Sequence, residues 1–195
     1  LFGPFSGTSA SGVCTILLGE NTPLLDATAL AVSLGSIKDV GGNPTPLVIP
    51  ATNISPSHLI TIDTVVPMIV SQALGAGNVF IDITFTEGLY TNILGTGSLN
   101  PSDFNLVLSQ NGGTATSVVI SSITTTLGGP IVGGETTFRL VFAITGQVSG
   151  LESIVIRPVL NEIFDRAGNA APTTTSTGVI TLFDTSPPVI LNVSS

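Results

Sequence analysis

The heptapeptide Ile163-Phe164-Asp165-Arg166-Ala167-Gly168-Asn169 resembles an earlier stretch of the chain, Ile37-Lys38-Asp39-Val40-Gly41-Gly42-Asn43. Each stretch is followed by a β-rich phrase that ends at a proline-marked turn, Ile60 to Pro67 in the first case and Ile180 to Pro188 in the second. Self-similarity over a long period is the mark of tandem copies of one folding unit. The sequence therefore predicts a repeat protein.

The alignment of the two copies also predicts how the chain is divided. Leu25-Asp26-Ala27 aligns with Leu151-Glu152-Ser153, and no gap is needed from there to the shared asparagine. We expect residues 1–62 to be the back half of one repeat and residues 63–184 to be a complete one. Residues 185–195 are then the first strand of a following repeat, or a donor strand for the next subunit. This framing predicts either a length of a longer array or a subunit that joins copies of itself.

The composition excludes several classes of protein. Hydrophobic residues make up 43% of the 195 residues and charged residues only 8%, against about 25% charged in an ordinary globular domain. Disordered chains combine low hydrophobicity with high charge, so disorder is excluded. The apolar runs are all shorter than the roughly 18 residues of a membrane span. With a net charge of -8 and four scattered basic residues, the chain lacks the basic patch that a nucleic-acid partner requires.

The local sequence patterns predict an all-β protein. Valine, isoleucine and threonine alternate with polar residues in short runs, and glycine and proline separate these runs. Asn100-Pro101-Ser102-Asp103 is expected to be a turn that enters a strand through one helical turn. Seven strands with turns between them predict an immunoglobulin-like β-sandwich. The predicted strands of the complete repeat are residues 68–73, 79–85, 104–109, 117–123, 136–143, 153–157 and 178–183.

The incomplete repeat is expected to contribute only the last three strands of a sandwich, near residues 13–18, 28–34 and 58–62. Half a sandwich leaves an apolar face exposed and sheet edges unpaired, which another chain can cover. Cys14 lies in the first of these strands, in an apolar setting. We interpret it as a small core residue, because free cysteines are most often buried.

Three phrases, in order, carry a family resemblance. They are Asp63-Thr64 followed by Pro67, then the strand Ile81 to Glu87, then the turn Asp165 to Asn169. This set resembles the bacterial immunoglobulin-like and cadherin-like tandem repeats of large extracellular surface proteins. The resemblance implies an immunoglobulin-like fold, and it implies duty as a stalk, an adhesin, a filament subunit or an enzyme appendage. The first repeat departs from the pattern at Val40-Gly41, where the family has Arg-Ala, and in a longer, proline-rich loop.

The sequence offers little for enzymatic chemistry, and we expect no enzyme. His58 is the only histidine, so a Ser-His-Asp arrangement would have to use it. The preferred interpretation places His58 in a loop or at the entry to a strand. The stretch from Gly7 to Ser11 lacks the last glycine of a nucleophile elbow. One cysteine and one histidine are too few ligands for a zinc site.

Calcium is the one metal that the sequence suggests, because it takes roughly six to eight oxygen ligands. Asp82 and Glu87 can join a calcium site if the edge of their strand faces the junction at which neighbouring repeats meet. The candidate calcium ligands are Asp39, Asn43, Asp63, Asp165, Asn169 and Asp184. The preferred alternative is that these six residues form turns, because Asp and Asn bond their own backbone.

Two asparagines, Asn53 and Asn192, are candidate glycosylation sites.

The functional prediction follows from the low charge together with the out-of-frame repeats. A free monomer usually carries charge on a quarter or more of its surface, so this surface is expected to be covered by other subunits or by glycans. The first hypothesis is an extracellular or cell-surface protein that assembles head-to-tail with its own copies into a filament, stalk or surface layer. The alternative is an adhesin module that binds a glycan or a host-surface ligand through residues 92–100 or 111–116. The third is an accessory domain of a secreted enzyme. The residues expected to donate the assembly strand are Val189, Ile190, Leu191 and Val193.

Overall fold

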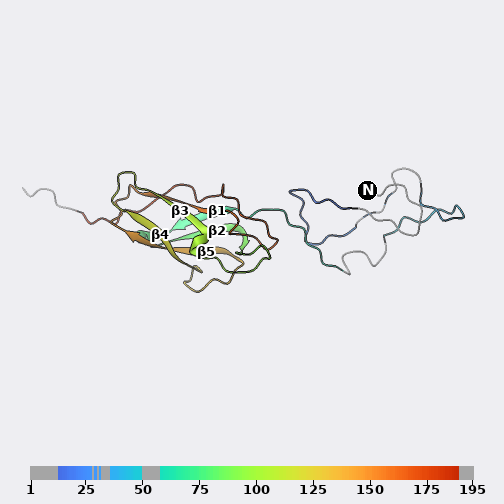
Figure 1. Cartoon of the computed structure of the whole chain (residues 1–195), viewed down its shortest axis with the longest axis horizontal. Helices are drawn as coiled ribbons and strands as arrows, with labels where there is room; N and C mark the ends of the chain where they lie inside the picture. The colour runs from blue at the N-terminus through green and yellow to red at the C-terminus, as the bar shows by residue number, and fades with distance from the viewer. Residues whose placement is uncertain (1–12, 28, 30, 32–35, 50–57, 189–195) are drawn as a thin grey trace, which may run out of the picture. The chain divides into compact units, whose positions relative to one another are not determined.

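The computed structural model describes residues 13–27, 29, 31, 36–49 and 58–188. The chain divides into two compact units, Leu1–Val65 and Val66–Ser195, and each is described by itself. The regular secondary structure of the described residues is nearly all β-strand, as the sequence predicts (Figure 1).

The strands of the second unit form two antiparallel sheets. The first sheet has four strands in the order β1-β2-β5-β4, and the second has three in the order β3-β6-β7. Six of the seven strands lie within a few residues of their predicted positions, whereas β7 has only two residues. The strands are β1 (Ile69–Leu74), β2 (Phe80–Leu89), β3 (Phe104–Ser109), β4 (Ser117–Thr124), β5 (Glu135–Thr145), β6 (Ser153–Pro158) and β7 (Ile180–Thr181).

The core of the second unit lies between the two sheets, because alternate residues of each strand point to the same face. The ring of Phe104 from the second sheet lies 5.5 Å from that of Phe138 in the first sheet, centroid to centroid. Phe85 stacks on the same Phe138 ring at 6.0 Å. The two sheets therefore share one core. Its large, fully buried apolar side chains are Ile81, Ile83, Phe85, Leu89, Phe138, Leu140, Ile154, Ile156, Ile163 and Leu182.

The segment before β3 forms the single helical turn that the sequence predicts. Pro101–Asp103 is a 3-10 helix, and the Asn100 side chain accepts a hydrogen bond from the Ser102 amide at 3.1 Å. The Asp103 carboxylate accepts from the Asn100 amide at 2.7 Å, which completes a capping box. Asp103 is buried, and this burial raises its pKa despite the Asn100 donors.

The described part of the first unit has no strand and only isolated bridges, Thr22 with Ile62 and Lys38 with Pro44. The predicted strands at 13–18 and 58–62 are therefore wrong in this structure, while 28–34 falls mostly outside the described residues. Val13 and Leu18 are 88% and 89% exposed. A strand is stabilised by a hydrogen-bonded neighbour and by burial of one face. In the described part of the first unit, backbone bonds join Ile62 to Thr22 and Ile60 to Leu25, but these contacts do not extend into a ladder.

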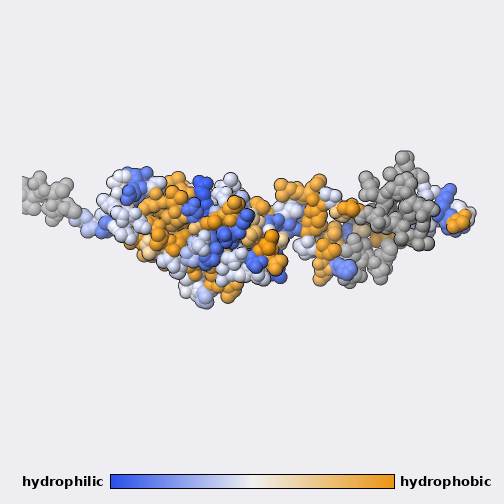
Figure 2. Space-filling view, viewed as in Figure 1, coloured by the Kyte–Doolittle hydropathy of each residue, from blue (hydrophilic) through white to orange (hydrophobic). Residues whose placement is uncertain are grey.

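The placement of Cys14 follows from the same difference. Cys14 is exposed, so its interpretation as a core residue is wrong. The apolar residues beside Cys14 would form a buried strand only if a second sheet covered them. The described residues of the first unit form no such sheet. Figure 2 shows apolar residues at the surface of both units.

Candidate functional site

The turn at Asp165 joins its first and last residues by three hydrogen bonds. The Asn169 amide donates to Asp165 Oδ1 at 2.9 Å, and Asn169 Nδ2 donates to Oδ2 at 2.7 Å. The Asp165 amide donates to the Asn169 carbonyl at 3.0 Å. Gly168 has a φ of 93°, a conformation that favours glycine. Asp165 is fully buried within the unit.

The turn at Asp39 repeats these contacts atom for atom. The Asn43 amide donates to Asp39 Oδ1 at 2.8 Å and Asn43 Nδ2 donates to Oδ2 at 2.8 Å. Gly42, in the place of Gly168, has a φ of 86°. The Asn43 side chain, followed by its backbone amide, lowers the pKa of Asp39. Unlike its counterpart, Asp39 is exposed to solvent.

A second turn also recurs in both units. The Val65 amide donates to Asp63 Oδ1 at 3.0 Å, and the Ser186 amide donates to Asp184 Oδ1 at 2.7 Å. Both are turns in which an aspartate bonds the backbone two residues ahead. All four predicted aspartate ligands thus bond to the backbone of their own turns.

The residue after each of these aspartates contacts a side-chain amide from far back in its unit. The Thr64 amide donates to Asn21 Oδ1 at 2.7 Å. In the second unit, Gln147 Nε2 donates to the Thr185 carbonyl at 2.6 Å. Sequence reasoning missed this pair. Asn21 and Gln147 stand at the same distance before the aligned Leu25 and Leu151, and both are amides, which is the signal that was available.

The structure does not gather the predicted calcium ligands of the second unit into one place. Phe164, beside Asp165, bridges to Tyr90, which follows the end of β2. Thr185, beside Asp184, bonds to Val148, which follows the end of β5. Antiparallel pairing of β2 with β5 puts these positions at opposite ends of the sheets. A carboxylate oxygen of Glu87 instead lies within 4.8 Å of one of Asp165.

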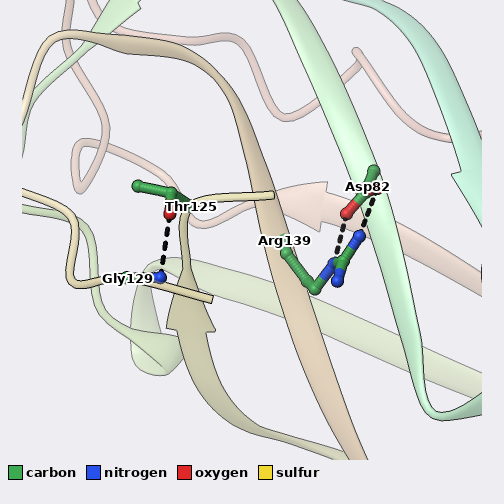
Figure 3. Close-up of polar contacts among 4 residues, drawn as sticks. All are labelled: Asp82, Thr125, Gly129 and Arg139. Atoms are coloured by element: carbon green, nitrogen blue, oxygen red, sulfur yellow. Dashed lines mark hydrogen bonds and ion pairs between the residues drawn. The ribbon is translucent and has the colours of Figure 1, made fainter. Parts of the chain in front are cut away.

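Asp82, which the sequence adds to the calcium candidates, pairs with Arg139 on the neighbouring strand (Figure 3). Arg139 Nε and Nη2 donate to the two carboxylate oxygens at 2.7 and 2.9 Å. The guanidinium also lies 3.5 Å above the Phe80 ring. The hydrogen bond to Asp82 raises the pKa of Arg139. This bidentate pair ties β2 to β5. In the same view, Thr125 Oγ1 accepts from the Gly129 amide at 3.0 Å and closes the turn after β4.

Glu152 is a buried carboxylate that sequence reasoning did not single out. Its Oε1 accepts from the amides of Thr114 and Ala115 at 2.7 and 2.8 Å. Its Oε2 accepts from the Ser149 amide at 3.0 Å. Burial alone would raise the pKa of Glu152, but the backbone amides around it outweigh this effect and lower the pKa to about 2. A Cβ at Gly113 would collide with the carboxylate.

Asn78 is a second buried polar residue that the sequence did not reveal. Its Nδ2 donates to the Phe183 carbonyl at 2.7 Å, and its Oδ1 accepts from the Phe183 amide at 2.8 Å. The side-chain amide thereby replaces a strand neighbour for the segment after β7. Asn78 has a φ of 60°, which asparagine tolerates better than most residues.

The remaining candidates are dispersed or lie outside the described residues. His58 is exposed. A shallow cleft beside β3 and β6 includes Arg157, and no ion pair to Arg157 occurs among the described residues.

Among all the residues that the structure describes, no helix has the length and apolar character to cross a membrane. The candidates outside the described residues are Asn53, Val189, Ile190, Leu191, Asn192 and Val193.

Comparisons with protein-family models, with curated proteins and with solved structures found no match to this chain.

Proposed function

We propose that the chain is an extracellular structural protein built from tandem immunoglobulin-like units, and that it assembles head-to-tail into a filament, stalk or surface layer. The fold part of the proposal is supported by strand order. The sheets β1-β2-β5-β4 and β3-β6-β7 have the order ABED and CFG of a constant-type immunoglobulin domain.

The observation that carries the proposal is the recurrence of the same turn contacts in both units. The Asp39 and Asp165 turns share their hydrogen bonds, and the Asp63 and Asp184 turns share theirs. Tandem copies of one unit produce such recurrence, and they suit an extended structural array in which each unit contacts its neighbours.

The mode of assembly rests on a complementarity between two parts of the chain. The described part of the first unit exposes apolar side chains, with Val13 88% and Leu59 87% exposed. The stretch 189–193, Val-Ile-Leu-Asn-Val, is uncharged and rich in β-forming residues. A strand donated from one copy to the next buries both, and such heterologous contacts propagate into a fibre.

Electron microscopy of the purified full chain tests the proposal. We expect ordered filaments or sheets from this chain alone, and we expect deletion of 189–195 to abolish them. This deletion keeps Ser186, whose Oγ donates to the Val148 carbonyl at 3.0 Å. A matched control changes only the polar tail residue Asn192 to serine and should still polymerise. Filaments that persist without 189–195 would refute strand donation.

An adhesin remains the second candidate, because one loop presents apolar side chains at its tip. The hairpin closed by the bridge between Asn92 and Thr96 leaves Ile93 61% and Leu94 79% exposed. Exposed aliphatic side chains on a loop suit a binding surface. Monodisperse rods in the same micrographs, instead of polymers, would favour this function.

A further inference from the structure

We infer that the outer edge of β3 is a self-complementary interface, at which two copies of the chain join antiparallel through their β3 strands. This inference concerns the second unit alone, and it does not rest on strand donation by residues 189–195. In the second sheet, β3 has β6 on one side and is the last strand on the other.

β3 differs from the other sheet edges because it carries no device against strand addition. β1 has an irregularity between Ile69 and Ser71, β4 has one between Ile120 and Ser122, and β7 is only two residues long. β3 pairs with β6 in unbroken register over six residues, and it contains no charge and no proline. Natural proteins usually protect edges with bulges, charges, proline or short strands, so an unprotected edge indicates a pairing surface.

The backbone groups that face this open edge can be assigned from hydrogen bonds on the other strands. The Val159 amide donates to the Asp103 carbonyl at 2.8 Å, and hydrogen-bonded pairs alternate with non-bonded pairs along an antiparallel ladder. Ile156, opposite Leu106, turns its amide and carbonyl away from β3, to Thr177. The amides and carbonyls of Leu106 and Leu108 therefore point to the open edge.

Phe104 offers this edge only an acceptor, because its amide already donates to the Pro101 carbonyl. No described residue bonds to the outward groups of Leu106 or Leu108. The outward pattern is thus an acceptor at Phe104, a donor and an acceptor at Leu106, and a donor and an acceptor at Leu108.

This pattern is complementary to itself when two β3 strands run antiparallel about Leu106. Each Leu106 amide then donates to the Leu106 carbonyl of the other copy, and each Leu108 amide donates to the other copy's Phe104 carbonyl. The one mismatch at Phe104, whose amide is occupied, leaves only the Leu108 carbonyl unpaired, where water can reach it. A symmetric contact of this kind is isologous and closes as a dimer.

The side chains fit the same arrangement. On the outer face, Asn105 of one copy comes opposite Val107 of the other, and Val107 is 49% exposed in the single chain. On the inner face, Phe104 comes opposite Leu108, which extends the core. The strand itself is uncharged, so pairing brings no like charges into contact in a chain whose net charge is -8. Salt should therefore strengthen the association by screening the remaining repulsion.

The test compares two double variants of the full chain by sedimentation velocity. Asn105→Glu with Val107→Glu places like charges opposite each other at two positions. We expect the dissociation constant of the dimer to be at least about tenfold larger than that of the unchanged chain. Asn105→Glu with Val107→Lys places opposite charges there, and we expect it to restore dimerisation. Both positions are exposed, and Asn105 lies opposite Arg157 on β6, a basic neighbour for the introduced carboxylate, so folding is preserved.

The matched control carries the same two added charges on another edge, Val119→Glu with Ser121→Glu on β4. It should dimerise like the unchanged chain, because both residues are exposed and their strand belongs to the other sheet. Amide hydrogen exchange supplies the local readout, with Leu106 and Leu108 protected at high protein concentration and unprotected on dilution. This readout separates β3 pairing from any polymer formed elsewhere on the chain.

Three outcomes would overturn the inference. The first is exchange at Leu106 and Leu108 that does not depend on concentration. The second is an equal loss of dimer in the β4 control. The third is a Glu and Lys variant in which the Leu106 and Leu108 amides stay unprotected at high protein concentration. That result would mean that β3 does not pair with β3 of the other copy.

Discussion

The two units contain the same turns, but the turns of the described residues differ in how deeply they are buried. Asp39 and Asp165 hold their asparagines through the same atoms, yet Asp165 is buried and Asp39 is exposed. A turn of five residues satisfies its own polar groups, so it forms with or without a sheet beside it. A strand depends on distant neighbours, and only the second unit supplies them within the described residues.

Glu152 and Asp26, aligned acidic residues, differ in the same way. Glu152 is fully buried, and its carboxylate organises the loop 113–115 and the turn at Ser149. Asp26 is exposed and its carboxylate accepts from the next amide along the chain, that of Ala27, at 2.9 Å. The comparison teaches that a repeated sequence position acquires a structural role only where the rest of the unit surrounds it.

The largest expected effect is a loss of core packing. Phe138→Ala removes a fully buried ring that contacts Phe85 and Phe104, and it should lower the free energy of unfolding by about 4 kcal/mol. Urea unfolding followed by Tyr90 fluorescence measures this selectively, since Tyr90 is the only tyrosine and the chain has no tryptophan. Val40→Ala in the first unit, where Val40 is exposed, should leave both this transition and the circular dichroism of the first unit unchanged. Equal effects from the two variants would remove the distinction between the units.

The next effect concerns the buried carboxylate. Glu152→Ala leaves the amides of Thr114, Ala115 and Ser149 without their acceptor, and we expect a loss of about 3 kcal/mol. Asp26→Ala should cost less than about 0.5 kcal/mol, as is usual for an exposed position. The same urea titration, supplemented by circular dichroism for the first unit, provides both values. A stability of Glu152→Ala close to that of the unchanged chain would contradict the role assigned to this residue.

The repeated turns should differ less. Asp165→Ala removes two acceptors inside the packed unit and should cost about 2 kcal/mol, whereas Asp39→Ala, at a fully exposed turn, should leave the unfolding transition where it is. We expect chelator to leave the melting temperature of the unchanged chain as it is, because these carboxylates bond to their own turns. A melting temperature that falls on chelation, and that no longer falls in Asp165→Ala, would instead establish a calcium site.

The last effect is a pH dependence. Backbone donors outweigh burial and lower the pKa of Glu152 to about 2, below its value of roughly 4.3 in an unfolded chain. The stability that this carboxylate contributes is therefore complete above the unfolded pKa and is lost as the pH falls toward about 2. Glu152→Gln should flatten the decline of the melting temperature between these pH values. An unchanged slope in Glu152→Gln would assign the acid sensitivity to other groups.

The sequence by itself determined the local features of this protein. Alternating apolar residues placed the strands, because a strand with one buried face shows a period of two at any position in a fold. The Asp, Gly and Asn spacing placed both repeated turns, and Asn100-Pro101 placed the helical turn before β3. Each of these depends on interactions between residues a few positions apart.

Only the tertiary structure decided which polar groups are buried and which predicted strands acquire partners. Asn78 substitutes for a strand opposite Phe183, and Glu152 collects amides from two loops, through contacts between residues far apart in the chain. The exposure of Cys14 and the absence of strands from the described residues of the first unit have the same origin. Burial and sheet pairing depend on residues that folding brings together from distant parts of the chain. A local sequence pattern indicates a strand, but it does not show whether the fold provides that strand with a partner.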